Sequence, residues 1–240
     1  MEHPILFISL ILDWIGLPVP HGPIGETFLQ KLCEPYLTYS WLIMAFLFVV
    51  PKLTLGRLEM VPGTGQNFWE ALIGGLMDFF AEHMGRKQAR MLFPMLATFF
   101  IYILLANMIG LLPGFMSPTS SLNITVAMTL IVWVFHHILG FRYHGIKYYK
   151  HFMGPLPVLA PFMLVLELIS NFARLVSLSM RLFGNIMAKE VLLSVLFMLA
   201  GAFFAPLPIL CLGVLVSIIQ AIVFVLLSVI YCTGAMEHAH

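Results

Sequence analysis

The sequence predicts an all-α integral membrane protein with about five transmembrane helices and one amphipathic helix at the membrane surface. Of its 240 residues, 61% are hydrophobic and only 10% are charged, and the mean hydropathy is +1.00. A soluble domain carries roughly 25% charged residues, so this chain is too apolar to be one. Long apolar stretches alternate with short loops that contain glycine, proline or basic residues. Because helices in lipid need no separate cores, we expect a single membrane domain.

The composition also excludes several classes of function. The net charge is +1 and there is no long basic run, which argues against nucleic acid as a partner. The three cysteines, Cys33, Cys211 and Cys232, are scattered without the spacing of a metal or redox site. The glycines at Gly63 and Gly65 are not followed by the Gly-Lys-Ser/Thr of a phosphate loop. We expect no catalytic residue, no metal and no cofactor.

The chain is expected to begin with an extracytoplasmic segment at residues 1–36. The apolar run in this segment follows Glu2 instead of a basic residue, and it has no convincing small-residue cleavage site, so we do not expect a cleaved signal peptide. The first transmembrane helix is predicted at residues 37–55, with Trp41 near its start.

Residues 67–84 predict an amphipathic helix that lies at the membrane surface. Its apolar and acidic side chains recur at helical spacing on opposite faces, and the acidic face makes it too polar to cross a bilayer. The apolar face comprises Trp69, Leu72, Ile73, Leu76, Phe79 and Phe80, and the acidic face comprises Glu70, Asp78 and Glu82.

Residues 89–141 predict a transmembrane hairpin with spans at 91–112 and 122–141. The loop between the two spans has no lysine or arginine, whereas the loops before and after the hairpin are basic. Basic loops stay in the cytoplasm. Five crossings then leave the N-terminus outside and the C-terminus inside. The basic residues are Lys52, Arg57, Arg86, Lys87 and Arg90 before the hairpin, and Arg142, Lys147 and Lys150 after it.

Residues 155–233 predict the longest helical region of the chain. The apolar stretch at 156–204 is too long for one perpendicular span. It is either two helices, which would give six crossings, or one long helix that is strongly tilted and buried on a partner. A last span is predicted at 209–231, and residues 234–240 form a tail, cytoplasmic for five crossings.

The long stretch contains a permanent cation, Arg181. An arginine near a bilayer centre is unfavourable by roughly 3 kcal/mol on insertion scales, so it needs a partner, a wet cavity or a function. It belongs to a stripe of polar side chains at intervals of three or four residues, which share one helix face. The stripe comprises Glu167, Ser170, Arg174, Ser177, Arg181 and Asn185.

The last span carries a second stripe, with Gln220 near its middle. The stripe comprises Gly213, Ser217, Gln220, Phe224, Ser228 and Tyr231. Gln220 has an acceptor oxygen that Arg181 lacks, so the two side chains are candidates to pair, and the alternative is that they only hold helices together. Glu190 follows Arg181 by nine residues, which is about 180° around a straight helix. We therefore expect the side chains of Arg181 and Glu190 to lie on opposite faces of the helix and to contact different parts of the structure.

Several of these residues carry a resemblance to a known family. The segment 177–185, Ser-Leu-Ser-Met-Arg-Leu-Phe-Gly-Asn, followed by Glu190, resembles the signature of subunit a of F-type ATP synthases. Three further segments resemble that family in the same order, and the resemblance covers residues 67–240. These segments are Asn-Met-Ile-Gly-Leu-Leu-Pro-Gly at 107–114, Pro-Thr-Ser-Ser-Leu-Asn-Ile-Thr at 118–125, and Gln-Ala-Ile-Val-Phe leading to Tyr231.

The resemblance implies a non-catalytic, proton-translocating subunit of a rotary ATP synthase. Its expected partners are the c-subunit ring, the peripheral-stalk b subunits, the remaining ATP synthase subunits and the lipid bilayer of a bacterial inner membrane. The long helix and the last helix would form a tilted hairpin against the ring. Two aqueous half-channels would carry the protons, and Arg181 would lie between them.

The resemblance also assigns roles to other residues. Gln220 would help to hold Arg181, Asn185 and Glu190 would belong to the extracytoplasmic half-channel, and Ser177 matches a serine on the same face. Glu167, Arg174, Lys189 and Asn107 are weaker candidates. The chain departs from the family in two ways. Gly213 stands where some members have a histidine, and Lys189 stands where many have a small residue. Lys189 would either act on Glu190 or reach the membrane surface.

Two other functions compete with this one. A secondary transporter could use a buried arginine to bind an anionic substrate, but such proteins usually show internal repeats, and none is visible here. A structural scaffold would give no reason for two aligned polar stripes.

Overall fold

The computed structural model describes residues 35–55, 62–112, 115–145, 160–200 and 206–236. Within these ranges the chain is helical and has no strand. The extracytoplasmic segment predicted at 1–36 lies outside the described residues, apart from its last two, and so do residues 237–240 of the predicted tail. The helices are α3 (Pro35–Thr54), α4 (Thr64–Met84), α5 (Arg86–Ile109), the short 3₁₀ helix η1 (Pro118–Ser120), α6 (Leu122–His144), α8 (Ala160–Ala200) and α9 (Pro206–Met236).

Five of these helices are long and apolar enough to cross a membrane: Tyr36–Thr54, Arg86–Ile109, Leu122–His144, Pro161–Leu196 and Pro208–Met236. This confirms the predicted fold class. The second span begins earlier than predicted, because the helix includes Arg86, Lys87 and Arg90 among its first five residues. Long basic side chains favour the helical conformation and can extend from a helix into water. The helix can therefore begin before the apolar stretch does.

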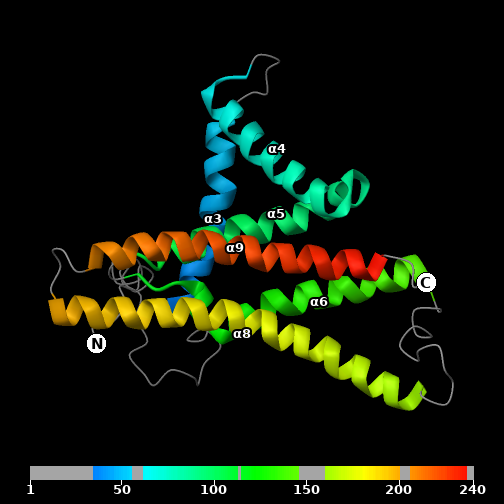
Figure 1. The fold of residues 1–240 in the computed structure, drawn as a ribbon. Coiled ribbons are helices and arrows are strands. Elements are labelled where there is room, and N and C mark those ends of the chain that lie inside the picture. The colour runs from blue at the N-terminus through cyan, green and yellow to red at the C-terminus, as the bar shows by residue number, and fades with distance from the viewer. Residues whose placement is uncertain (1–34, 56–61, 113–114, 146–159, 201–205, 237–240) are drawn as a thin grey trace, which may run out of the picture.

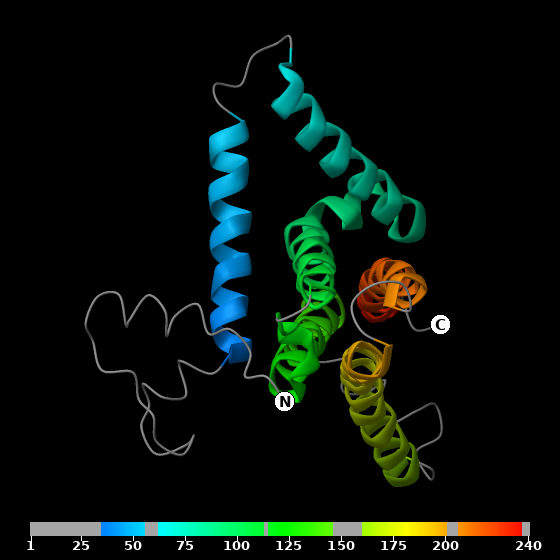
Figure 2. The ribbon, with the colours of Figure 1, turned by 90° about the vertical axis from the view of Figure 1, so that its left-hand side faces the viewer.

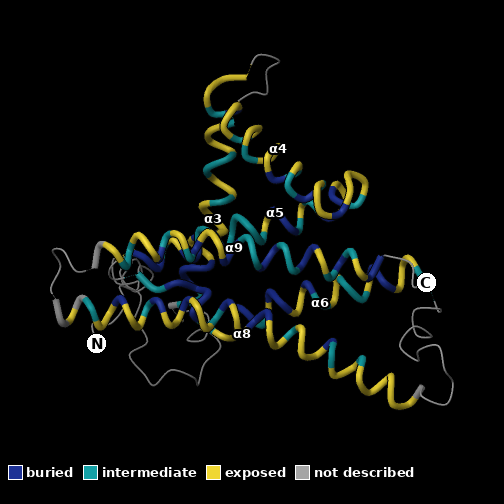
Figure 3. The backbone as a smooth tube through the Cα atoms, in the orientation of Figure 1, coloured by how far each residue is buried: buried dark blue, intermediate teal, exposed yellow. Residues whose placement is uncertain are grey.

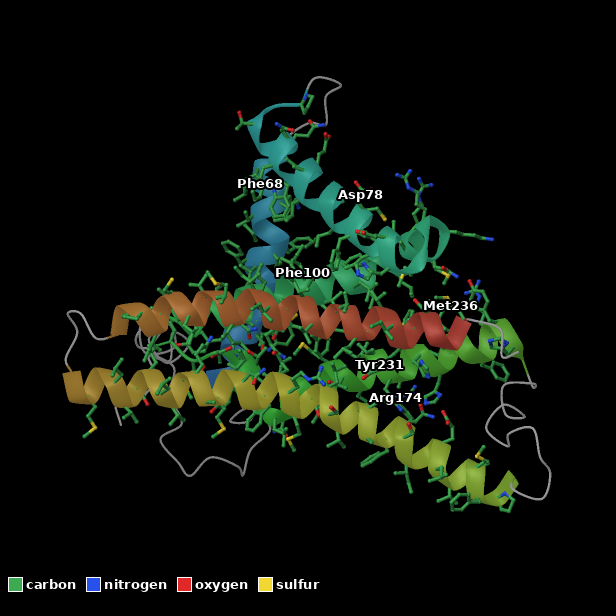
Figure 4. All side chains as sticks on the ribbon, in the orientation of Figure 1. Phe68, Asp78, Phe100, Arg174, Tyr231 and Met236 are labelled. Atoms are coloured by element: carbon green, nitrogen blue, oxygen red, sulfur yellow. The ribbon has the colours of Figure 1, made fainter. Side chains whose placement is uncertain are left out.

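α4 is the amphipathic helix that the acidic and apolar faces predict. Leu76, Phe80 and Met84 of its apolar face are buried. Figure 4 shows Asp78 on the outer side of the helix, away from the bundle, and the residue is exposed. Gly85 ends α4 with a φ of 81°, a left-handed conformation that glycine adopts at little cost, and α5 begins at the next residue.

α8 is one continuous helix of 41 residues, which decides between the two alternatives for the long apolar stretch. Such a helix is about 60 Å long, so it fits a hydrocarbon layer about 30 Å thick only at a steep inclination. In Figures 1 and 2, α8 and α9 run together across α3 instead of along it. They lie side by side near their connection and diverge toward Ala160 and Met236, where α6 lies between them.

The core lies where α4, α5, α6, α8 and α9 meet. Small residues on α5 and α9 are buried there, including Ala89, Ala106 and Ala221, each with 0% exposure. Small side chains let helix backbones approach closely, which supplies the van der Waals contact that holds helices together in lipid. α8 contributes little to this core, and Figure 3 shows most of its length as exposed. Its large core side chains are Leu178, Leu182, Ile186 and Leu193.

Candidate functional site

Arg181 lies on the outer face of α8, with its side chain exposed. Ser177 and Asn185, one turn before and after it, are exposed as well. Large apolar side chains flank this stripe, including Met180 at 49% and Met187 at 46% exposure. No hydrogen bond or ion pair joins the guanidinium group to another residue in the described ranges. Among the described residues, its N–H donors therefore have no acceptor.

Gln220 of α9 pairs with Asn185 and not with Arg181. Its side chain is only 4% exposed, and its Oε1 accepts a hydrogen bond from Asn185 Nδ2 at 2.7 Å. The expected pairing with Arg181 is therefore wrong for this structure. The reason is geometric, because Gln220 is buried between the helices while Arg181 points away from them. Asn185 lies at the edge of the contact and reaches Gln220 across it.

The polar stripe of α9 is turned into the bundle. Gly213, Ser217, Gln220, Phe224 and Ser228 are all buried. The two serine hydroxyls donate to the main-chain oxygens of Gly213 and Phe224, four residues earlier in each case, at 2.7 and 2.8 Å. The serine hydroxyls of this stripe thus find their hydrogen-bond acceptors within α9 itself. The stripe of α8, in contrast, faces outward.

Lys189 is buried, with 8% of its surface exposed. Its Nζ donates to the main-chain oxygen of Asn107 at 3.0 Å and lies 3.2 Å from Ser217 Oγ. This burial argues against one of the two alternatives for this lysine, that it reaches the membrane surface. A buried ammonium group is costly unless hydrogen bonds replace its water, and here a helix end supplies an acceptor.

The end of α5 explains this contact. The last four main-chain oxygens of a helix have no partner within it. In α5 each of these oxygens has a donor, two of them from distant side chains and two from the following turn. The pairs are Ser117 Oγ to Ala106 O (2.8 Å), Lys189 Nζ to Asn107 O (3.0 Å), Leu111 N to Met108 O (3.1 Å) and Leu112 N to Ile109 O (3.0 Å). The positive charge of Lys189 also suits the negative end of the α5 dipole.

Glu190 holds the segment that follows α5. Its Oε1 accepts a hydrogen bond from the main-chain N–H of Ser117 at 2.8 Å. The hydroxyls of Ser117 and Thr119 are 2.6 Å apart, and Thr119 donates to Asn107 Oδ1 at 2.6 Å. Asn107 Nδ2 is buried without a hydrogen-bond partner in the described part of the chain. Lys189 and Glu190, adjacent in sequence, therefore fasten the two sides of the turn between α5 and α6 to α8.

Two glycines make room for this cluster. A Cβ at Gly213 would lie 2.5 Å from Leu111 Cδ2 and 3.4 Å from Lys189 Cδ. A Cβ at Gly110 would lie 2.7 Å from Ser117 Cβ and 3.0 Å from Glu190 Oε1. Because Gly213 has no side chain, Leu111 and the aliphatic part of Lys189 can pack against the backbone of α9 at this position.

A second polar group lies toward the start of α8. Figure 4 shows Arg174 and Tyr231 close together in the space between α8 and α9, and the guanidinium carbon is 5.6 Å from the centroid of the Tyr231 ring. His136 Nδ1 lies 2.8 Å from the main-chain oxygen of Tyr231. Asn171 Nδ2 lies 3.4 Å from Glu167 Oε1. Three helices, α6, α8 and α9, therefore contribute polar side chains to this group.

Three members of these groups, His136, Ser117 and Thr119, are not among the candidate site residues that the sequence predicts. The run Ser117-Pro118-Thr119-Ser120 at the start of a span was the available signal, because hydroxyls in apolar surroundings need partners. In the described ranges, no three histidine, cysteine or acidic side chains gather as a metal site would require.

Comparison with known proteins identifies the family. The sequence model for "ATP synthase A chain" matches residues 37–233. The chain belongs to the family of ATP synthase subunit a. Over 240 residues, which is all of this chain and all of each relative, it is 69% identical to the ATP synthase subunit a of Desulfotalea psychrophila (strain LSv54 / DSM 12343). It is 45% identical, over the same full length, to those of Syntrophobacter fumaroxidans (strain DSM 10017 / MPOB) and Desulfosudis oleivorans (strain DSM 6200 / JCM 39069 / Hxd3).

As a member of the ATP synthase subunit a family, the chain is a non-catalytic subunit of the membrane sector of an F-type ATP synthase, with several transmembrane helices. The full-length match removes support for a secondary transporter or a simple scaffold. It also agrees with the resemblance that the segment around Arg181 carries.

Proposed function

We propose that this chain translocates protons, and that two aqueous half-channels and Arg181 couple proton flow to rotation of a c-subunit ring and to ATP synthesis. The observation that carries the proposal is Arg181 itself, an exposed cation on an apolar helix face without a partner among the described residues. Leaving such a charge in lipid is unfavourable by at least roughly 3 kcal/mol. A partner with a negative charge, held by another subunit, would remove that cost.

The chemistry of arginine suits this role. An opposite charge at close range favours the ionised form of a carboxylic acid. A ring carboxylate that reaches Arg181 would therefore release its proton. Because a guanidinium group is not deprotonated in proteins, Arg181 cannot pass that proton directly from one half-channel to the other.

Three exposed residues near Arg181 on α8 are small, which supports close contact with another helix. They are Ser177, Gly184 and Ala188, and a Cβ added to Gly184 would meet nothing within 4 Å among the described residues beyond its neighbours on α8. Small residues allow helix backbones to approach closely in a membrane. We infer that a ring helix packs here, with its carboxylate opposite Arg181.

The two polar groups lie on opposite sides of Arg181 along α8, which supports two separate access paths. Glu190 follows Arg181 by nine residues, or about 13 Å, and Arg174 precedes it by seven, or about 10 Å. On the predicted orientation, Glu190 with Asn107 and Lys189 belongs to the extracytoplasmic path. The group at Arg174 and Glu167 belongs to the cytoplasmic one.

Other subunits of the complex would contact this chain within its membrane. The c-ring would contact the α8–α9 hairpin, and the peripheral-stalk b subunits would hold the chain against the turning ring. The chain would lie in a bacterial inner membrane. Basic residues flank the hairpin of α5 and α6 while its connecting loop has none, which favours a cytoplasmic position for both flanks. The N-terminus would be extracytoplasmic and the C-terminus cytoplasmic.

The decisive experiment replaces the arginine. Arg181→Ala should abolish proton-driven ATP synthesis in reconstituted vesicles without preventing assembly of the complex. Arg181→Lys should also fail largely, because a point charge does not reproduce the planar fork of donors. Arg142→Ala, at an exposed position in the last turn of α6, is the control and should keep normal synthesis. Normal synthesis by assembled Arg181→Ala complexes would refute the proposal.

A further inference from the structure

A small open pocket lies where α6 separates α8 from α9. Its cavity volume is about 20 Å³, room for about one water molecule, within about 300 Å³ of space that is partly open to the surroundings. His136, Asn171, Arg174 and Tyr231 contribute to its lining. Thr129, Trp133 and three aliphatic side chains complete its walls. The pocket therefore brings one histidine to an opening in the bundle, on the Arg174 side of Arg181.

The hydrogen bond of His136 fixes which of its nitrogens carries a proton. The main-chain oxygen of Tyr231 is an acceptor only, and it lies 2.8 Å from His136 Nδ1. Nδ1 must therefore be the protonated nitrogen of the neutral ring, which leaves the lone pair of Nε2 unprotonated. Within the described part of the chain, Nε2 makes no hydrogen bond. This nitrogen can take up a proton without breaking the bond to Tyr231.

The charged and titratable groups near His136 come from all three helices. On α8, Arg174 lines the same pocket, and Glu167 lies two turns before it, within 3.4 Å of the pocket residue Asn171. On α6, the ring of His137 has its centroid 5.1 Å from that of His136. On α9, the Tyr231 ring lies beneath the Arg174 guanidinium group. On α8, the cation Arg174 disfavours the charged form of the histidine, whereas the carboxylate Glu167 favours it.

We propose that His136 is the proton-exchanging group of the cytoplasmic access path, a role that rests on the proposed proton translocation by this chain. A hydronium ion in the pocket gives its proton to Nε2, which leaves water and the imidazolium ion. Nε2 then gives a proton to a water molecule on the other side, which forms a hydronium ion again. The Nδ1–H group stays bonded to the Tyr231 oxygen throughout, so the helix contact survives each cycle. No other group is consumed.

The test uses the complete membrane sector, stripped of its catalytic subunits, in inverted vesicles with the predicted cytoplasmic side facing the medium. Passive proton flow is driven by a potassium diffusion potential and measured between about pH 5 and pH 8, where histidine changes its charge. His136→Gln keeps an amide donor for Tyr231 but cannot titrate. Its proton flow should fall by about tenfold or more, since proton-transfer groups contribute at least that much, and its dependence on external pH should flatten.

His83→Gln is the matched control. His83 Nδ1 makes the same kind of contact, 2.8 Å from the main-chain oxygen of Phe79, but on the exposed surface of α4. Its flow and pH profile should stay as in the unchanged chain. A His136→Gln profile that matches the unchanged chain would overturn the inference and leave His136 as a contact between α6 and α9.

A second variant keeps the inference testable if His136→Gln fails to assemble. Leu175 lines the same pocket, and Leu175→Cys, in a chain whose native cysteines are replaced, should react with a water-soluble thiol reagent added from the predicted cytoplasmic side. A cysteine at 175 that does not react would exclude a wet pocket. The Arg181→Ala experiment separates the two proposals. If Arg181 proves essential while the His136→Gln profile is unchanged, only the role of His136 fails.

Discussion

The ammonium nitrogen of Lys189 lies 3.0 Å from the main-chain oxygen of Asn107, so a side chain of α8 caps the end of α5. Glu190, the next residue, accepts from the N–H of Ser117 on the far side of the same turn. Two adjacent charges of opposite sign thus bind a main-chain oxygen that the end of α5 leaves free and the main-chain N–H of Ser117, just before η1. Lys189 and Glu190 therefore hold the structure together at the place where the proposed extracytoplasmic path would run.

Lys189→Met should destabilise the chain by about 1–3 kcal/mol, the cost of leaving a buried acceptor poorly paired. Methionine keeps most of the side-chain volume, so the change isolates the hydrogen bond from the packing. Thermal melting in detergent, followed by tryptophan fluorescence, measures the effect. An unchanged or higher melting temperature would mean that burying the ammonium group costs as much as its hydrogen bonds contribute.

Gly213→Ala should lower the melting temperature, because its Cβ would lie 2.5 Å from Leu111 Cδ2. We expect about 1–3 kcal/mol, typical of overpacking. Leu111→Ala removes the clashing atom, so the double variant should be less destabilised than the sum of the two single variants. Additive effects would show that the clash is relieved elsewhere.

Glu190→Gln separates charge from hydrogen bonding. The amide oxygen of glutamine can still accept from Ser117 N–H, so the melting temperature should change little. A glutamine cannot carry a proton, so proton flow through the membrane sector should fall strongly. Glu190→Leu should lose both properties. If Glu190→Gln conducts protons normally, Glu190 serves only to hold the turn.

Asn185 and Gln220 should be energetically coupled through their 2.7 Å hydrogen bond. A double-mutant cycle with Asn185→Ala and Gln220→Ala should give a coupling of about 0.5–1.5 kcal/mol in thermal stability. For function, Gln220→Leu should impair ATP synthesis less than Arg181→Ala does. An equal or greater loss at Gln220 would mean that the roles of the two residues are reversed.

Gly184→Leu tests the exposed face beside Arg181. Apart from its neighbours on α8, no described residue lies within 4 Å of a Cβ at this position, and leucine favours helix more than glycine does. The melting temperature of the purified chain should therefore not fall. ATP synthesis by the assembled complex should fall, because the larger side chain would keep a ring helix at a distance. Unchanged synthesis would argue that no helix packs at Gly184.

Much of the fold follows from features that are local in sequence. Apolar stretches of the right length predicted the spans, and the opposed faces of residues 67–84 predicted α4. The interval between Arg181 and Glu190 predicted that the two side chains address different places, because helix geometry fixes the angle between residues on one helix. In the structure Arg181 is exposed and Glu190 reaches Ser117, on the other side of α8.

Contacts between helices were harder to predict from the sequence. Gln220 was expected to meet Arg181, but it meets Asn185, one turn further along the same stripe. A shift of one turn depends on how far two helices rotate and slide against each other, and side chains of the whole interface decide this. The burial of Lys189 was hard to predict for the same reason. Its acceptor is at the end of another helix, 82 residues away in sequence.

The sequence by itself determined that this chain is a membrane protein with a polar stripe around Arg181, since hydrophobicity and helical period are properties of single segments. Only the tertiary structure decided which polar groups are satisfied within the chain and which are left to a partner. Lys189, Glu190 and Gln220 find acceptors or donors on neighbouring helices, while Arg181 has none among the described residues. The physical reason is that hydrogen bonds reach only about 3 Å, so helix packing decides which groups can meet.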